Sequence, residues 1–274
     1  MEALRGNLRK MVATAETPVA YALPVGDLLL PLNALLGKAI RLEYGGQIHC
    51  VACGHLTKKS FHDGYCFRCF SSLARCDLCI VKPELCHYAH GTCREPAWGL
   101  ANCMQPHYVY LANASGLKVG ITRASQVPTR WLDQGAIQAL SVLRVQSRHQ
   151  AGLLEVAIKK YVSDRTDWRK MLRGEPESHD LYARRGELLN WCSEELTACA
   201  SSAEENVFAP LEDETIHTFS YPVLTYPTRV TALNFDKTPV IEGTLLGMKG
   251  QYLILETGVL NARKFTGYSV SVSF

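Results

Sequence analysis

Nine of the eleven cysteines in this chain lie between Cys50 and Cys103. The sequences CVAC and CFRC set the first four in the pattern C-x2-C-x12-C-x2-C, formed by Cys50, Cys53, Cys66 and Cys69. Each pair can present two thiolates from one tight turn, and two such pairs complete the tetrahedron of sulfur ligands that Zn²⁺ accepts. A redox-active CxxC is the alternative, but the repeated pair favours a structural site in a zinc-ribbon-like region.

A second group of cysteines follows directly and opens with another CxxC pair, Cys76 and Cys79. We expect this pair to bind a second structural Zn²⁺. The other two ligands come from residues among which the spacing does not choose: Cys86, Cys93 and Cys103, with His87 as a fallback. Because closed four-ligand sites leave no open position for a substrate, both zinc sites are expected to hold shape rather than to catalyse.

Clustered CxxC pairs indicate metal binding in a reducing compartment rather than a disulfide framework. The N-terminal sequence MEALRGNLRKMVATAETPVA has no apolar stretch typical of a secretory signal. The longest apolar run, near LLLPLNALLG, is broken by Pro31 and is too short to span a bilayer. We therefore expect a cytoplasmic protein without a membrane partner.

The patterns of apolar residues and turns predict an α+β chain in five segments. Both ends are β-rich, and the Gly-Gly in AIRLEYGGQIHC predicts a hairpin in the first of them. Whether the two ends pair with each other is left open. The segments are a β-rich N-terminal segment at 1–49, the cysteine region at 50–106, a central α/β domain at 107–173, an acidic helical segment at 174–214, and a small β-barrel-like domain at 215–274.

Charge is distributed unevenly along the second half of the chain. Residues 118–173 contain 11 Lys and Arg against 4 Asp and Glu, whereas residues 174–215 contain 2 Arg against 11 Asp and Glu. This order suggests a surface that faces a polyanion, with an acidic neighbour. Two solvated faces of one domain are the alternative.

The acidic segment includes one predicted helix, HDLYARRGELLNWCSEELTACA. Its two cysteines, Cys192 and Cys199, share the apolar side of that helix. We interpret them as core thiols rather than as metal ligands.

The stretch HYVYLANASGLKVGITR, residues 107–123, predicts a β-hairpin with two different faces. Alternation directs one set of side chains into a core: Val109, Leu111, Val119 and Ile121. The other face carries two phenols, an ammonium group and a hydroxyl: Tyr108, Tyr110, Lys118 and Thr122. Gly120 lies on this second face and leaves room for another group to approach the backbone. An ordinary surface hairpin would show the same alternation.

Charged residues follow the hairpin at intervals. Arg123 ends the second strand, and Arg130 opens the first helix in PTRWLDQGA. Glu155 interrupts the apolar run LLEVAI of the strongest predicted helix, HQAGLLEVAIKKYV. A solvated helix face is one interpretation of Glu155. A partly buried carboxylate is the other, and it would need a partner such as a cation.

This order of features resembles the GIY-YIG endonuclease superfamily over about 65 residues. Val109-Tyr110 is similar to the end of the first motif, with Tyr108 in place of its Gly. Lys118-Val119-Gly120 is similar to the second motif, with Lys118 in place of its Tyr. Arg130 is similar to the helix Arg of the superfamily, and Glu155 to its metal-binding Glu. The Asn that often ends the motif set has no equivalent in SDRTDWRKML.

The resemblance implies a zinc-stabilised nuclease that hydrolyses phosphodiester bonds in DNA or RNA. Glu155 would bind Mg²⁺ or Mn²⁺, and Arg130 would contact the charge that develops on the phosphoryl group. Tyr110 would deprotonate or position the attacking water, and Lys118 would favour its phenolate or bind phosphate. The residues expected to contact nucleic acid are Tyr108, Gly120 and Arg123.

Two other functions remain open. A nucleic-acid or ribonucleoprotein binding module that keeps the fold without catalysis is favoured by Lys118 and by the missing Asn. A protein-interaction scaffold with a protein partner is suggested by the zinc and β modules and the acidic helix. The retention of Tyr110, Arg130 and Glu155 together favours the nuclease. The whole chain, with its cysteines ahead of HYVYLANASGLKVGITR and WLDQGA, also resembles a cysteine-rich, zinc-binding bacterial family of unknown function.

Overall fold

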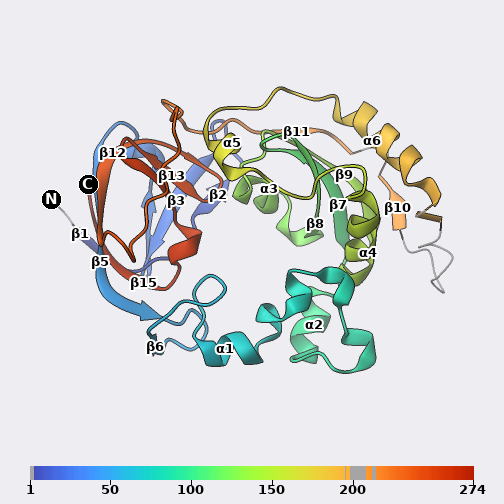
Figure 1. Ribbon diagram of the computed structural model, residues 1–274, viewed down its shortest axis with the longest axis horizontal. Coiled ribbons are helices and arrows are strands. Elements are labelled where there is room, and N and C mark those ends of the chain that lie inside the picture. The colour runs from blue at the N-terminus through green and yellow to red at the C-terminus, as the bar shows by residue number, and fades with distance from the viewer. Residues whose placement is uncertain (1–2, 195, 198–207, 212–213) are drawn as a thin grey trace.

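The computed structural model describes residues 3–194, 196–197, 208–211 and 214–274. Figure 1 shows three parts: a β unit built from both ends of the chain, a central unit with helices on a sheet, and the cysteine region, which connects them along one side. This mixture of helices and sheets confirms the predicted α+β class.

Both ends of the chain contribute strands to one antiparallel sheet. The strand order is β1 (Ala3–Asn7), β15 (Tyr268–Ser273), β5 (Ala39–His49), β12 (Val240–Lys249), β13 (Tyr252–Leu255) and β14 (Gly258–Asn261), and β6 (Leu56–Thr57) pairs with β5. The question that the sequence left open is thereby answered, because the two ends do pair. The C-terminal strands do not close into a barrel of their own, since they need β1 and β5 as partners.

A second, three-stranded sheet completes the β unit. Its strands are β2 (Val12–Thr14), β3 (Ala20–Val25) and β4 (Leu28–Pro31). Leu23 of this sheet shares one hydrophobic core with Leu42 and Leu253 of the larger sheet. Two single 3-10 turns lie within the unit, η1 (Asn33–Leu35) and η7 (Arg263–Phe265).

The hairpin predicted around Gly45-Gly46 is wrong. β5 runs unbroken through both glycines, and Gly46 takes a φ of 77°. The pairing with β15 shifts register between Tyr268 and Val270. The two glycines therefore form a bulge within a long strand, because glycine adopts the left-handed conformation without steric cost.

The central unit has an antiparallel sheet in which β7 (His107–Asn113) lies between β8 (Leu117–Arg123) and β9 (Gln138–Val145). The short strands β10 (Phe208–Pro210) and β11 (His217–Thr218) pair with the other edge of β9. Helix α4 (Arg148–Ile158) packs on one face and begins at a capping box formed by Ser147 and Gln150. As predicted, the apolar side chains of the hairpin lie in this core: Val109, Leu111, Val119 and Ile121.

The opposite face of this sheet is covered rather than open. Helices α3 (Thr129–Asp133) and α5 (Trp168–Leu172) contribute to its core, which also contains Ile254 and Val259 of the β unit. Tyr110 is fully buried here, and its ring meets that of Trp131 at an edge-on angle with centroids 6.0 Å apart. The β unit and the central unit therefore share an apolar interface.

The acidic segment contains α6 (Leu181–Trp191). Cys192 follows it, is buried in the same core as Leu154 of α4, and donates its S–H to the carbonyl of Leu188 at 2.7 Å. This confirms Cys192 as a core thiol, whereas Cys199 lies outside the described residues. Among the described residues, no helix has both the length and the apolar character needed to cross a bilayer.

The cysteine region has little regular structure. It contains two short helices, α1 (Phe67–Ser72) and α2 (Pro96–Asn102), separated by four 3-10 turns: η2 (Ala74–Cys76), η3 (Leu78–Ile80), η4 (Pro83–Leu85) and η5 (Tyr88–His90). A further 3-10 turn, η6 (Ala124–Gln126), precedes α3. Because the region has few backbone hydrogen bonds between strands or within long helices, its shape depends on side-chain contacts or on bound metal.

Candidate functional site

The first four cysteines converge in space. Their sulfur atoms all lie within 4.8 Å of one another: Cys50, Cys53, Cys66 and Cys69. The sulfurs of Cys53 and Cys66 are 3.8 Å apart, and a tetrahedron with Zn–S bonds of about 2.3 Å has edges of about that length. These four residues could bind a metal ion, as their spacing predicts.

Local structure sets up this site. Cys66 caps α1, and its sulfur accepts the N–H of Cys69 at 3.5 Å. Although burial acts in the opposite direction, backbone N–H groups including those of Cys66 and Cys53 lower the pKa of Cys50 to about 6. These N–H groups favour the thiolate of Cys50, which is the form in which cysteine binds metal.

The second group of cysteines is divided. A small cavity of about 10 Å³ is lined by four of them: Cys79, Cys86, Cys93 and Cys103. Cys76 is not among the lining residues; it is buried, and burial raises its pKa to about 11. Of the CxxC pair expected to start the second site, Cys79 lines the cavity and Cys76 does not, and the pair stays a prediction.

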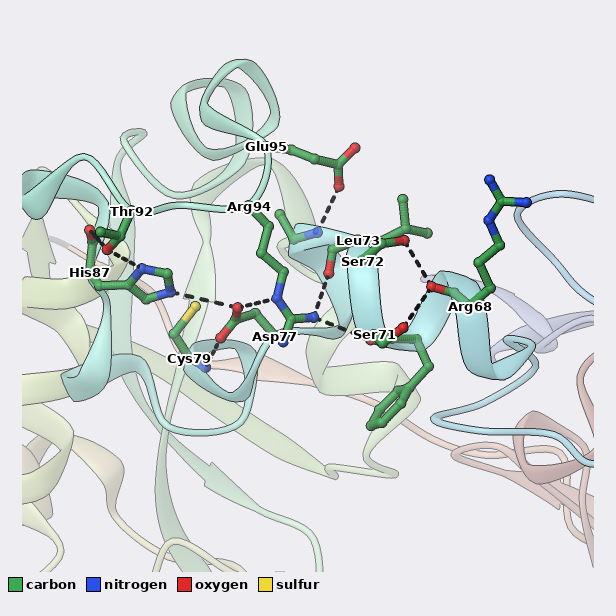
Figure 2. Close-up of polar contacts among 12 residues, drawn as sticks. Arg68, Ser71, Ser72, Leu73, Asp77, Cys79, His87, Thr92, Arg94 and Glu95 are labelled. Carbon is green, nitrogen blue, oxygen red and sulfur yellow. Dashed lines mark hydrogen bonds and ion pairs between the residues drawn. The ribbon is translucent and has the colours of Figure 1, made fainter.

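Two polar residues join this neighbourhood. Asp77, Cys79 and His87 place their ligand atoms within 4.8 Å of one another. Figure 2 shows Asp77 between the guanidinium of Arg94, at 2.6 Å, and the imidazole of His87, at 3.6 Å. Although burial acts to raise it, the N–H of Cys79 and the charge of Arg94 lower the pKa of Asp77. Sequence reasoning missed Asp77, because an Asp beside cysteines carries no spacing signal.

The four predicted catalytic residues come together from four elements: Tyr110 from β7, Lys118 from β8, Arg130 from α3 and Glu155 from α4. Burial lowers the pKa of Lys118 to about 8, with Arg130 acting in the same direction and Glu155 against it. Burial raises the pKa of Glu155, against the effects of Arg130 and Lys118. Lys118, Arg130 and Glu155 thus lie within electrostatic reach of one another.

Tyr110 occupies the innermost position of this group. Its hydroxyl donates to Oε1 of Gln134 at 3.0 Å. Burial raises its pKa, while the nearby Arg130 guanidinium opposes that change. A phenol so enclosed is poorly placed to accept a proton from water.

Two further charged residues complete the group, and sequence reasoning missed both. Burial makes the largest contribution to the raised pKa of Glu155, and the charge of Asp164 adds to it. The charge of Arg148 acts to lower the same pKa. Asp164 reaches this place because the carbonyl of Ser163 accepts the N–H of Val119 at 2.8 Å, which fixes the segment beside β8.

The residues expected to contact nucleic acid occupy different environments. Tyr108 is half-buried on β7. Gly120 does not leave room for a ligand, because the Tyr110 ring fills the space above it: a Cβ there would lie 2.6 Å from the Tyr110 hydroxyl oxygen. Arg123 donates to Oδ1 of Asn102 and faces a large cleft.

This cleft, of about 570 Å³, lies where the three parts of the molecule meet. Six arginines from all three parts line it: Arg9, Arg75, Arg123, Arg130, Arg148 and Arg263. Both carboxylates of the lining are ion-paired at 2.8 Å: Asp63 with Arg263 and Asp133 with Lys10. We call this feature the basic cleft. Arg130 and Arg148 connect it to Glu155, which is not itself part of the lining.

Comparison with known proteins gives one match. The family model described as "Protein of unknown function (DUF2797)" matches residues 37–270. No curated protein and no solved structure matches the chain. Because the matched range includes the cysteine region, the central unit and most of the β unit, the chain belongs to the DUF2797 family.

Proposed function

We propose that this protein is a zinc-stabilised, divalent-metal-dependent nuclease that hydrolyses phosphodiester bonds in DNA or RNA through a GIY-YIG-like site. The observation that carries the proposal is the convergence of Lys118, Arg130 and Glu155 beside the basic cleft. A phenol, two cations and a carboxylate gathered from four elements are costly to bury without a function that uses them.

Glu155 and Asp164 would hold the divalent cation. They are close enough for Asp164 to raise the pKa of Glu155, and a cation between them would relieve that repulsion. Carboxylate oxygens are the ligands that Mg²⁺ and Mn²⁺ prefer. When bound, such an ion supplies Lewis-acid stabilisation of the phosphoryl oxygens.

Lys118 is a better proton acceptor than Tyr110. Its pKa of about 8 leaves a fraction of the amine neutral near physiological pH, and tuned lysines of this kind serve as general bases. The high pKa and complete burial of Tyr110 suit a supporting role, in which its ring and hydroxyl hold Arg130 and Gln134 in place.

Arg130 would contact both the bound nucleic acid and the catalytic residues. It lines the basic cleft and also acts on the ionisation of Glu155 and Lys118. A phosphate bound by the arginines of the cleft would contact the guanidinium of Arg130, which lies within electrostatic reach of Glu155. The six arginines supply the charge that polyanion binding needs.

A nucleic-acid binding module without catalysis is the second candidate. It is favoured by the burial of Tyr110 and by the absence of Glu155 from the cleft lining. The two candidates share the basic cleft and differ in their dependence on divalent metal.

The test is incubation of labelled single- and double-stranded DNA and RNA with wild type and Arg130→Ala, with and without Mn²⁺. The nuclease predicts metal-dependent cleavage that Arg130→Ala slows by about 100-fold. Arg41→Ala is the matched control, because Arg41 is paired with Glu242 at 2.7 Å and does not line the cleft. Salt-sensitive binding without cleavage under any condition would support the binding module instead.

A further inference from the structure

The basic cleft carries positive charge that its own carboxylates do not neutralise. One of its six arginines is ion-paired, since Arg263 lies 2.8 Å from Asp63. The other five come from all three parts of the molecule: Arg9, Arg75, Arg123, Arg130 and Arg148. Within the part of the chain that the structure describes, none of these five has a carboxylate at ion-pair distance. Several such cations in one cleft attract a polyanion.

Charge is only part of the lining. Apolar and aromatic side chains share the same walls: Val51, His62, Tyr65, Ile80, Val81 and Ile121. Phosphates gain nothing from such side chains, whereas bases do. In a duplex the bases present only their edges in the grooves, but in a single strand their faces are open to stacking. The composition of the cleft therefore favours a single strand.

The two aromatic residues of the lining belong to one tight turn. The backbones of Phe61 and Tyr65 pair with each other, with distances of 2.8 Å from N–H to carbonyl in both directions. The turn between them consists of His62, Asp63 and Gly64. His62 and Asp63 have φ angles of 41° and 62°, a region that residues with side chains seldom adopt. Such a conformation persists only where surrounding contacts hold it.

Contacts with the β unit hold this turn against the cleft. Asp63 is paired with Arg263 of η7 at 2.8 Å. A Cβ on Gly64 would lie 2.6 Å from the side chain of Val51 and 2.9 Å from the carbonyl oxygen of Thr266. The turn is thus packed in place before any ligand binds, which lowers the entropy cost of binding.

The two rings form the accessible edge of an aromatic cluster. The ring centroids of His62 and Tyr65 are 6.5 Å apart. Phe70 of α1 lies 6.4 Å from His62 and stacks on Phe61 at 5.7 Å. His62 is exposed and Tyr65 is half-buried, and both line the cleft. Aromatic faces of this kind stack with bases of any sequence.

The size of the cleft also favours one strand over two. The three parts of the molecule surround it (Figure 1), and its volume of about 570 Å³ lies in the range of about 300–1,000 Å³ that small-ligand sites occupy. A few nucleotides of one strand can enter such a space. A duplex, whose major groove alone is about 12 Å wide, would have to lie across the mouth.

We propose that the basic cleft binds a single strand of nucleic acid, whose phosphates contact the arginines and whose bases stack on Tyr65 and His62. This inference rests on the proposed function, because it names the form of nucleic acid that the same cleft takes.

The test compares fluorescent probes of equal length, about 12 nucleotides, by anisotropy without added divalent metal, so that binding is measured apart from cleavage. The probes are a single strand, the same strand annealed to its complement, and a strand of abasic residues, which has phosphates but no bases. The first two are prepared as both DNA and RNA. We expect the single strand to bind at least about 10-fold more tightly than the duplex or the abasic strand.

Two variants remove the rings. Tyr65→Leu and His62→Asn are each expected to weaken binding of the single strand by about 5- to 10-fold and to leave the abasic strand unaffected. Asn is chosen at position 62 because it tolerates a positive φ. Tyr65→Phe keeps the ring and should bind as wild type does. Tyr182→Leu is the matched control, because Tyr182 is exposed on α6 and lies outside the cleft. Thermal unfolding of each variant checks its fold.

Equal affinity for the single strand and the duplex, or for the normal and the abasic strand, would overturn the inference. So would wild-type affinity in both ring-removal variants, or a lack of binding to every probe. Cleavage with Mn²⁺ is measured separately on the same samples, so the nuclease proposal stands or falls on its own result.

Discussion

Tyr110 and Gly120 face each other across β7 and β8, and a Cβ on Gly120 would lie 2.6 Å from the Tyr110 hydroxyl oxygen. Gly120→Ala is therefore expected to lower the free energy of unfolding by about 1–3 kcal/mol through overpacking. Urea denaturation measures this change. Tyr110→Leu in the same chain should recover part of the loss in a double-mutant cycle. Equal stability of Gly120→Ala and wild type would contradict the packing described.

The first metal site should support folding. Cys66→Ser removes a sulfur that also caps α1, and we expect loss of about one Zn²⁺ and a fall in unfolding free energy of at least about 3 kcal/mol. Cys192→Ser, which replaces a core thiol, is the control and should keep its full zinc content. Zinc content and thermal unfolding are measured on the same samples. Retention of all zinc by Cys66→Ser would exclude it as a ligand.

Lys118 should make stability depend on pH. Burial lowers its pKa to about 8 in the folded chain, whereas an unfolded lysine ionises near 10.4. The unfolded chain binds more protons between these values, so the free energy of unfolding rises with pH across this window. Relative to Lys118→Met, wild type is expected to gain about 2–3 kcal/mol between about pH 7.5 and 10.5. Parallel urea-unfolding profiles for the two proteins would show that Lys118 ionises normally.

Each arginine of the basic cleft should contribute to the affinity for polyanions and to the salt dependence of that affinity. Arg75 lines the cleft from the cysteine region and has no part in the proposed chemistry. Arg75→Ala is expected to weaken binding of a labelled oligonucleotide and to reduce the slope of log K against log salt by about 1. Fluorescence anisotropy over a range of salt concentrations measures both, with Arg41→Ala as the control. An unchanged slope would place the binding surface elsewhere.

Features encoded by short sequence spacing were predicted well. The Cys50 and Cys66 pairs each form within one turn, so the C-x2-C spacing was enough to predict that their sulfurs meet. The helix around Glu155 and the apolar face of the hairpin follow from periodicity, which the structure confirms.

Features that depend on long-range contacts were not predicted. Cys79, Cys86, Cys93 and Cys103 line one small cavity although they come from separate turns, and the local CxxC spacing does not predict this. Gly45-Gly46 was interpreted as a turn because the partner strand β15 lies more than two hundred residues away, and its register is not visible in the local sequence. The burial of Tyr110 depends on α3 and on strands from the far end of the chain.

The most direct test of the account is the Mn²⁺ dependence of oligonucleotide cleavage by wild type, Glu155→Gln and Glu187→Gln. Glu187 is an exposed helical glutamate paired with Arg184 at 2.7 Å, which makes it a matched control. The account predicts that wild type and Glu187→Gln cleave only with metal, and that Glu155→Gln is at least about 100-fold slower while still binding the oligonucleotide. Cleavage by Glu155→Gln at the wild-type rate, or none by wild type, would contradict it.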